Sequence, residues 1–307
     1  MGGAEISETV ILSVLLLSLA FSLGFALNRG STCAVIAMAE LVQERRPARF
    51  VALLECTLWG ALTYAAWHLM PGSETRWSGF GFAATGGTIF GVGAFVNGAC
   101  AFGSVGHLGN GDTEFGFTFL GMYAVATVAG LGGLLPAVMA SPMSLAIAPP
   151  VALLLLVSFA ALRFVLQRRN VTAYRNMSCA MLAVGVAYTT IILLKPGWSI
   201  ALSHAHPLPL ASVVTVAAMF AGSVLSRALS RGNYRVKWPS FRGAARRLAG
   251  GIMMGVGAVL IPGGNDTMLL VGLPQGAEQA VLAYLLFAAS IAILVRTIGS
   301  SAHAWSR

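Results

Sequence analysis

Four cysteines carry the most reactive side chains in this chain of 307 residues. A thiol is a weak hydrogen-bond donor with a polarizable sulfur atom, which suits contact with a soft, sulfur-containing ligand. Cys33, Cys100 and Cys179 stand in sequence elements that are marked by repetition or by a turn, and we take them as candidate ligand-contacting residues. A buried cysteine is also a common small core residue, so both uses stay open for these three. Cys56 lies inside an uninterrupted apolar run, and we expect it to be a core residue.

Other uses of thiols find no support in the spacing of the motifs. There is no Cys-x-x-Cys and no His-x-x-x-His, so we expect no metal site. There is no Gly-x-Ser-x-Gly and no cysteine, histidine and acid spacing typical of a triad, so we expect neither an enzyme nor a bound cofactor. Four cysteines in a chain of this length also make no disulfide framework.

The amino-acid composition shows whether these residues lie in a soluble protein or in a membrane protein. Hydrophobic residues make up 57% and charged residues 9% of the chain, and the mean hydropathy is +0.80. These values exclude an ordinary soluble enzyme, a disordered chain and a nucleic-acid-binding domain, even with a net charge of +9. We predict an all-α polytopic membrane protein surrounded by lipid.

Ten apolar passes are predicted from the hydropathy pattern. They lie near 9–27, 30–43, 50–70, 83–97, 116–135, 149–166, 178–194, 209–228, 248–262 and 277–295. The passes 30–43, 83–97 and 248–262 are shorter than the 20 or so residues that a crossing needs, so we expect half-helices or broken helices there. With the N-terminus inside, 16 basic residues fall inside and only Arg29, Arg76 and Lys195 fall outside. This asymmetry predicts that both termini are cytoplasmic.

The chain repeats itself. Gly86–Ala94 matches Gly250–Ala258 at six of nine positions, and Arg29–Cys33 and Arg175–Cys179 are both Arg-x-x-x-Cys elements in the same order. Each half then holds five passes, and an odd number turns the second half upside down. We therefore predict an inverted-topology repeat, with residues 1–140 as the first membrane repeat and 141–307 as the second.

The glycines of the repeated element allow close helix packing, or close approach of a ligand to half-helix backbone. They are Gly87, Gly91, Gly93, Gly251, Gly255 and Gly257. Both glycine helices end in turn-forming residues, Asn97–Gly103 and Pro262–Asp266, and an apolar stretch follows each. Backbone breaks inside a membrane only where protein or a water-filled cavity satisfies it. Paired breaks in two halves therefore indicate a binding site, which adds Gly264 and Asn265 to the candidates.

Arg29 is the remaining candidate. Basic residues at span ends commonly extend to the interface. As one of three basic residues on the predicted outside, Arg29 is also placed to attract an anion.

At this point the sequence resembles the YeeE/YedE family of sulfur-compound transport membrane proteins. The resemblance rests on motifs spread over residues 24–274: Gly24-Phe25, Arg29–Cys33, Gly86–Cys100, Gly103–Asp112, Arg175–Cys179, Gly250–Asn265 and Gly272–Pro274. It implies a bacterial inner-membrane permease built from an inverted repeat with re-entrant hairpins, and thiosulfate or a related small sulfur-containing anion as its substrate. It also implies that the anion passes along cysteines, here Cys100 and Cys179, with Cys33 as a further candidate.

One residue departs from the family pattern. The second glycine motif usually reads Pro-Gly-Cys-Asn, whereas this chain has Gly264 in place of the cysteine. Asn265, Asp266 or water are the candidates to stand beside Gly264 in place of the missing thiol. Two alternatives to a permease are a membrane sulfur-relay component that hands sulfur to a soluble cytoplasmic persulfide carrier, and a degenerate structural or regulatory membrane partner.

Overall fold

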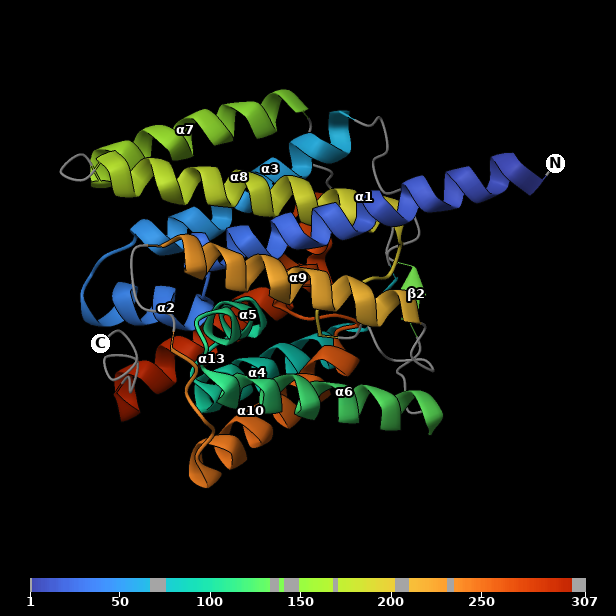
Figure 1. Ribbon diagram of the computed structural model, residues 1–307. Coiled ribbons are helices and arrows are strands. Elements are labelled where there is room, and N and C mark those ends of the chain that lie inside the picture. Colours follow the sequence, from blue (N-terminus) through green and yellow to red (C-terminus); the bar gives the residue numbers. More distant parts are fainter. Residues whose placement is uncertain are drawn as a thin grey trace.

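The computed structural model describes most of the chain. Its described residues are 2–66, 76–132, 138–140, 149–167, 171–201, 210–230 and 235–299. Nine helices of 16 residues or more run side by side through this part, as Figure 1 shows. They are α1 (Gly2–Arg29), α3 (Ala48–Ala66), α4 (Phe80–Asn97), α6 (Gly116–Leu131), α7 (Pro149–Gln167), α8 (Val171–Leu194), α9 (Leu210–Leu229), α10 (Phe241–Leu260) and α13 (Glu278–Ile298).

Shorter elements fill the spaces between these helices. They are α2 (Ala34–Gln43), α5 (Ala101–Gly109), a 3₁₀ turn η1 (Thr113–Phe115), α11 (Asn265–Thr267), a π-helical turn η2 (Met268–Gly272) and α12 (Leu273–Gln275). Strands β1 (Arg76–Ser78) and β2 (Val138–Ala140) pair antiparallel, with Trp77 opposite Met139. Five stretches of the described chain are long and apolar enough to cross a membrane, and a bent pair, α10 with residues 265–275, makes a sixth. The predicted all-α polytopic membrane fold is confirmed.

The three passes that were expected to be half-helices or parts of broken helices differ from one another in the structure. Residues 30–43 form only a turn and the 10-residue α2, so they make no crossing. Conversely, α4 has 18 residues and α10 has 20, so neither is a half-helix. The predicted pass began only at residue 248 because the first turns of α10 carry three charges, on Arg242, Arg246 and Arg247, which lower the hydropathy there. The short helices are those that follow, α5 after α4 and α11–α12 after α10.

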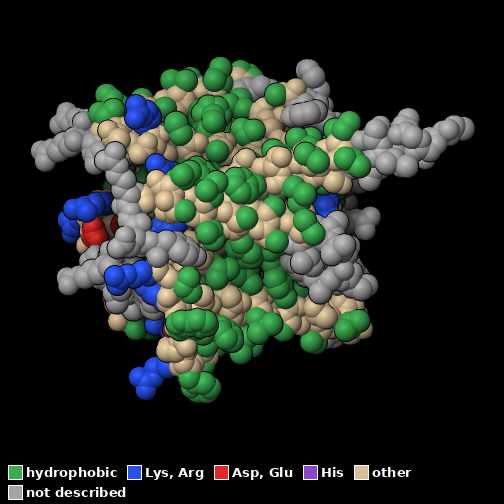
Figure 2. Space-filling view, in the orientation of Figure 1, with side chains coloured by type: hydrophobic (Ala, Val, Ile, Leu, Met, Phe, Trp, Pro, Cys, Tyr) green, Lys and Arg blue, Asp and Glu red, His purple; other side chains and the backbone are tan. Residues whose placement is uncertain are grey.

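Because residues 30–43 make no crossing, the number of crossings between the start of α1 and the end of α13 falls by one. Figure 1 shows the start of α1 at one end of the bundle and the end of α13 at the other. That both termini are cytoplasmic stays a prediction, because residues 1 and 300–307 lie outside the described residues. Arg29 lies at the end of α1 opposite its start: its guanidinium donates to Ser230 Oγ (2.9 Å), and Arg49 donates to the neighbouring Ser31 carbonyl (2.9 Å). Basic side chains gather at this same end in Figure 2.

The acidic segment before α6 also lies at the basic end and is neutralised there. Asp112 accepts from His107 Nδ1 (3.1 Å) and pairs with Lys237 Nζ (2.7 Å). Burial raises the pKa of Asp112, but hydrogen bonds from His107 and Lys237 outweigh it, so this pKa lies below its ordinary value. Glu114 accepts from the backbone and hydroxyl of Ser240 at 3.1 and 2.8 Å. These contacts tie the loop before α6 to the loop before α10.

Helix contacts come in matched pairs, which supports an inverted repeat. Helix α1 packs on α9 as α8 packs on α3, and α6 packs on α10 as α13 packs on α4. The pairs α4 with α10 and α1 with α8 join the two halves. We propose that α1–α6 and α8–α13 are the two repeats and that α7, which packs on α3 and α8, is an addition.

This pairing changes one predicted equivalence. Arg29 ends α1, whereas Arg175 lies in the first turns of α8. The first Arg-x-x-x-Cys element therefore begins at the C-terminal end of α1, whereas the second lies near the N-terminal end of α8. The two elements are not equivalent positions of the repeat. The segment that corresponds to the turn before Cys33 is the one after α8, which contains Ser199.

The repeated glycines are packing positions in this structure. A Cβ on Gly257 would lie 2.7 Å from the Gly86 carbonyl oxygen, and one on Gly93 would lie 2.7 Å from the Met254 nitrogen, so α4 and α10 touch backbone to backbone. The other four repeat the same arrangement in each half. Gly87 and Gly91 meet α13 at Ala283 and Phe287, and Gly251 and Gly255 meet α6 at Thr118 and Met122.

This packing predicts a stability difference between two glycines. Gly257→Val is expected to destabilise the protein by about 1–3 kcal/mol, because its side chain would overpack backbone atoms. Gly81→Val in α4 is the control, since a Cβ there meets nothing within 4 Å. Thermal unfolding of the purified proteins in detergent measures both. Equal melting temperatures for the two variants would contradict the close packing of α4 on α10.

Candidate functional site at the broken helices

The first break lies between α4 and α5 and is closed by hydrogen bonds. Gly98 ends α4 with φ +83°, a left-handed conformation that glycine adopts without strain. The Asn97 amide donates to the Ala99 carbonyl (2.7 Å) and to Ser104 Oγ (2.9 Å). Its carbonyl oxygen accepts from Thr118 Oγ1 at 2.7 Å. One buried asparagine thus satisfies the polar groups of a turn that water does not reach.

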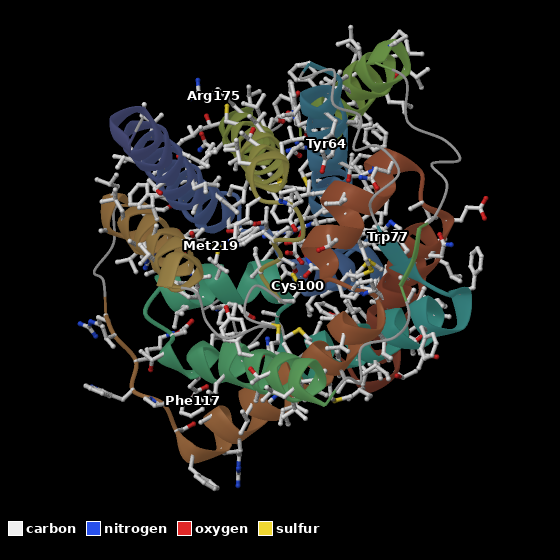
Figure 3. The ribbon with its side chains drawn as sticks, turned by 90° about the vertical axis from the view of Figure 1, so that its right-hand side faces the viewer. Tyr64, Trp77, Cys100, Phe117, Arg175 and Met219 are labelled. Atoms are coloured by element: carbon white, nitrogen blue, oxygen red, sulfur yellow. The ribbon has the colours of Figure 1, made fainter. Side chains whose placement is uncertain are left out.

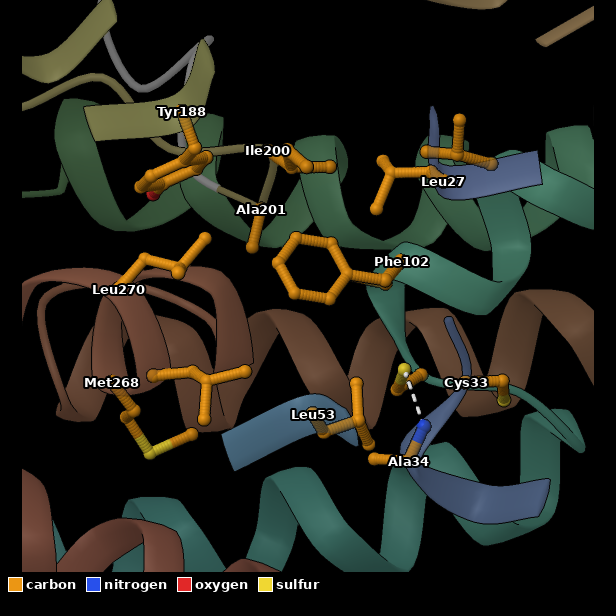
Figure 4. Packing of buried hydrophobic residues seen from close by; sticks show 14 of the residues in the cluster. Leu27, Cys33, Ala34, Leu53, Phe102, Tyr188, Ile200, Ala201, Met268 and Leu270 are labelled. Atoms are coloured by element: carbon orange, nitrogen blue, oxygen red, sulfur yellow. Dashed lines mark hydrogen bonds between the residues drawn. The ribbon is translucent and has the colours of Figure 1, made fainter. Parts of the chain in front are cut away.

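Two cysteines meet at this break. Cys100 is the residue before α5 and Cys33 is the residue before α2, and both are buried. The backbone N–H of Ala34 donates to Cys100 Sγ at 3.3 Å, which is the dashed line in Figure 4. A Cβ on Gly103 would lie 2.6 Å from Cys33 Sγ, so a glycine at this position makes room for the thiol. The structure therefore brings Cys33 and Cys100 together.

The second break, after α10, contains a buried carboxylate. Gly263 has φ +146°, and Gly264 follows in extended conformation with φ −90°. Asp266 Oδ2 accepts from the Ile200 backbone (2.7 Å), from Ser199 Oγ (3.0 Å) and from the Tyr188 hydroxyl (3.0 Å). Asp266 Oδ1 and Asn265 Oδ1 are buried without a hydrogen-bond partner.

Asp266 is the residue that stands beside Gly264. A Cβ built on Gly264 would lie 2.5 Å from Asp266 Oδ1, 3.0 Å from the Ala201 side chain and 3.5 Å from Phe90. Because the backbone of Gly264 is extended, a cysteine would cause no backbone strain there. The carboxylate of Asp266 occupies the space that a side chain on Gly264 would take.

The two breaks lie in one region of the bundle. Helix α5 packs on α2 and on α11, and Phe102, Ile200, Ala201, Met268 and Cys33 belong to one buried cluster in Figure 4. Figure 3, which looks along the helices, shows Cys100 near the middle of the bundle. Backbone N–H groups at the starts of α2 and α5 carry partial positive charge. Thiols and N–H groups together make a region suited to a soft anion.

The other candidates lie elsewhere. Cys179 is exposed in the uninterrupted α8, away from the thiol pair. Arg29 lies at the basic end of the bundle with Ser230. The six repeated glycines face neighbouring helices rather than the turns. Cys56 is buried and donates to the Leu53 carbonyl at 2.9 Å, as a core residue does.

Sequence reasoning missed a buried ion pair. Glu55 of α3 lies near the end of the predicted pass 50–70, where a carboxylate is expected to reach water, but it is buried and pairs with Arg163 of α7. Ser178 Oγ accepts from Arg163 at 2.8 Å, and Trp59 Nε1 donates to Glu55 at 3.3 Å. The sequence signal for this pair was Arg163, a charged residue inside the predicted apolar pass 149–166, which needs a partner there. Within the described ranges, no three His, Cys, Asp or Glu side chains form a group that could hold a metal ion.

A family model described as sulphur transport matches the chain twice, over residues 29–148 and 145–293. No curated protein matches it.

Proposed function

Because the chain belongs to the sulphur transport family, as its resemblance to YeeE/YedE proteins predicted, we propose that it is a permease for thiosulfate or a related small sulfur-containing anion. The chain is a multi-pass membrane protein that transports a sulfur compound. The substrate within that class and the route through the protein are our proposals.

The observation that carries the proposal is the pair of buried thiols at the first break. Cys33 and Cys100 lie where two helices begin, at a point where the transmembrane bundle is interrupted. A charged group inside hydrocarbon is costly, so a selective path must replace its water with fixed dipoles. Backbone N–H groups supply the dipoles, and the two thiols supply weak donors and polarizable sulfur.

The proposed orientation follows from the basic residues. We place the end of the bundle that holds Arg29, Arg46, Arg49 and Lys237 in the bacterial cytoplasm. Helix α13 then ends on the cytoplasmic side and α1 begins on the opposite side. The anion enters from that opposite side, passes the two breaks and leaves towards the basic end.

Uptake into proteoliposomes tests the function. Purified protein is reconstituted and supplied with labelled thiosulfate, sulfite, sulfate and selenite, one at a time. We expect uptake of thiosulfate or sulfite above that of empty liposomes, and little uptake of sulfate, whose sulfur is enclosed by oxygen. Uptake of none of the four would contradict a permease of this class and favour a structural or regulatory membrane partner.

A further inference from the structure

The two breaks have corresponding contacts but different chemistry. In the first half, the N–H after Cys33 donates to the Sγ of Cys100. In the second half, the N–H after Ser199 donates to the Oδ2 of Asp266. Both acceptors lie at the start of the short helix that follows a break, and both donors lie in the segment that follows a paired long helix. A hydroxyl and a carboxylate thus take the places of the two thiols.

The exchange matters because a carboxylate and a thiol treat an anion differently. A thiol is neutral and its S–H donates a hydrogen bond. An ionised carboxylate only accepts, and it repels an anion in a medium of low dielectric constant. A protonated carboxyl is neutral and donates, so it behaves towards an anion as the thiol does.

The two oxygens of Asp266 lie in different surroundings, which bears on where a proton can bind. Its Oδ2 receives three donors, whereas its Oδ1 has no hydrogen-bond partner and points at Gly264 in the turn. No salt bridge to Asp266 exists among the residues that the structure describes. The free oxygen is therefore the atom on which a proton, or an anion held through that proton, finds room.

Asp266 is the carboxylic acid of the second break, and the titratable groups around it are of other kinds. From α8, the phenol of Tyr188 faces it as a donor, with Tyr64 of α3 next to that phenol. From the first break, helix α5, which begins after Cys100, packs on α11, the helix that contains Asp266.

We propose that Asp266 is a proton-binding residue of the pathway and that the anion passes only while this carboxyl is protonated, so that uptake is coupled to proton entry. This inference rests on the proposed permease function. A proton from the side of anion entry binds Oδ1, and the O–H donates to the passing anion. After the anion has moved on, the proton leaves to the opposite side, so one proton crosses with the anion. No covalent bond to sulfur forms or breaks.

The test is a pH profile of thiosulfate uptake in proteoliposomes, because the charge of thiosulfate does not change near neutral pH. We expect wild-type uptake to fall as pH rises, approaching about tenfold per pH unit once most of the carboxyl is ionised, because a buried carboxyl without a counter-charge favours its neutral form. Asp266→Asn keeps a carbonyl oxygen for the three donors and offers an N–H in place of the acid O–H. It is expected to take up thiosulfate with a flat profile.

Two variants separate this role from others. His107→Gln removes the imidazole that pairs with Asp112 beyond the end of α5, and this variant is expected to keep the wild-type profile. Tyr188→Phe removes a donor to the ionised carboxylate, so the midpoint is expected to move to higher pH. A purely structural Asp266 would leave the profile of Asp266→Asn like that of the wild type, which overturns the proposal.

A measurement on the wild-type protein tests proton coupling even if Asp266→Asn does not fold. A pH-sensitive dye trapped in the lumen is expected to report acidification when thiosulfate is added outside at acidic pH. Thiosulfate uptake without acidification overturns proton coupling and leaves the permease intact. No uptake at any pH overturns the permease itself, and the proton proposal with it.

Discussion

Replacing Cys100 with alanine is expected to abolish uptake of the sulfur anion, whereas Cys56→Ala leaves it nearly unchanged. Cys100 lies at a helix break and meets Cys33, while Cys56 lies inside α3 and donates to its own helix. Both are fully buried, so burial alone does not distinguish them. Removing one thiol from a core costs about 1 kcal/mol, so both variants are expected to fold.

The measurement is initial uptake of labelled anion per folded protein. Cys100→Ser is a graded third variant, because its hydroxyl keeps a donor at the turn but lacks polarizable sulfur, and intermediate uptake is expected. Equal loss in Cys100→Ala and Cys56→Ala at equal amounts of folded protein would show that position at the break does not select the working thiol.

Glu55→Gln is expected to destabilise the protein severely. It leaves the buried Arg163 guanidinium without its carboxylate, and breaking a buried pair in this way costs about 3–5 kcal/mol. The effect is expected to be larger here than for an exposed pair, since water is absent around apolar helices. Arg46→Gln is the control: its salt bridge with Glu44 leaves 75% of the arginine side chain exposed and contributes little.

Folded yield and melting temperature in detergent test this expectation. The double variant Glu55→Leu with Arg163→Met is expected to recover most of the stability, because apolar residues often replace a buried ion pair without loss. If Glu55→Gln melts like the wild type, the pair does not hold α7 against α3.

The sequence was sufficient for the membrane class, for the helical breaks and for the residues at them. Continuous apolar runs and paired glycine turns at Gly98 and Gly263 carry that information, because backbone inside a membrane must be satisfied. Helix lengths were predicted less well. Hydropathy separates apolar from charged segments, and the charged first turns of α10 remain helical beyond that boundary.

Side-chain direction could not be predicted in the same way. Cys33 and Cys179 carry the same local motif, but one begins a helix and is buried, and the other is in mid-helix and exposed. A five-residue pattern does not specify which end of a helix it occupies. The contact between Asp266 and the segment after α8 joins residues far apart in the chain, and only the packing of the two halves brings them together.

The fate of the two sulfur atoms of thiosulfate tests the central claim most directly. Proteoliposomes are supplied with thiosulfate labelled separately in its inner and outer sulfur, and the lumen and the protein are analysed by mass spectrometry. Passage of the intact anion predicts both labels in the lumen in equal amounts and an unmodified Cys100. A persulfide on Cys100, with sulfite released outside and only the outer sulfur retained, would contradict a permease and indicate a sulfur relay to a soluble carrier.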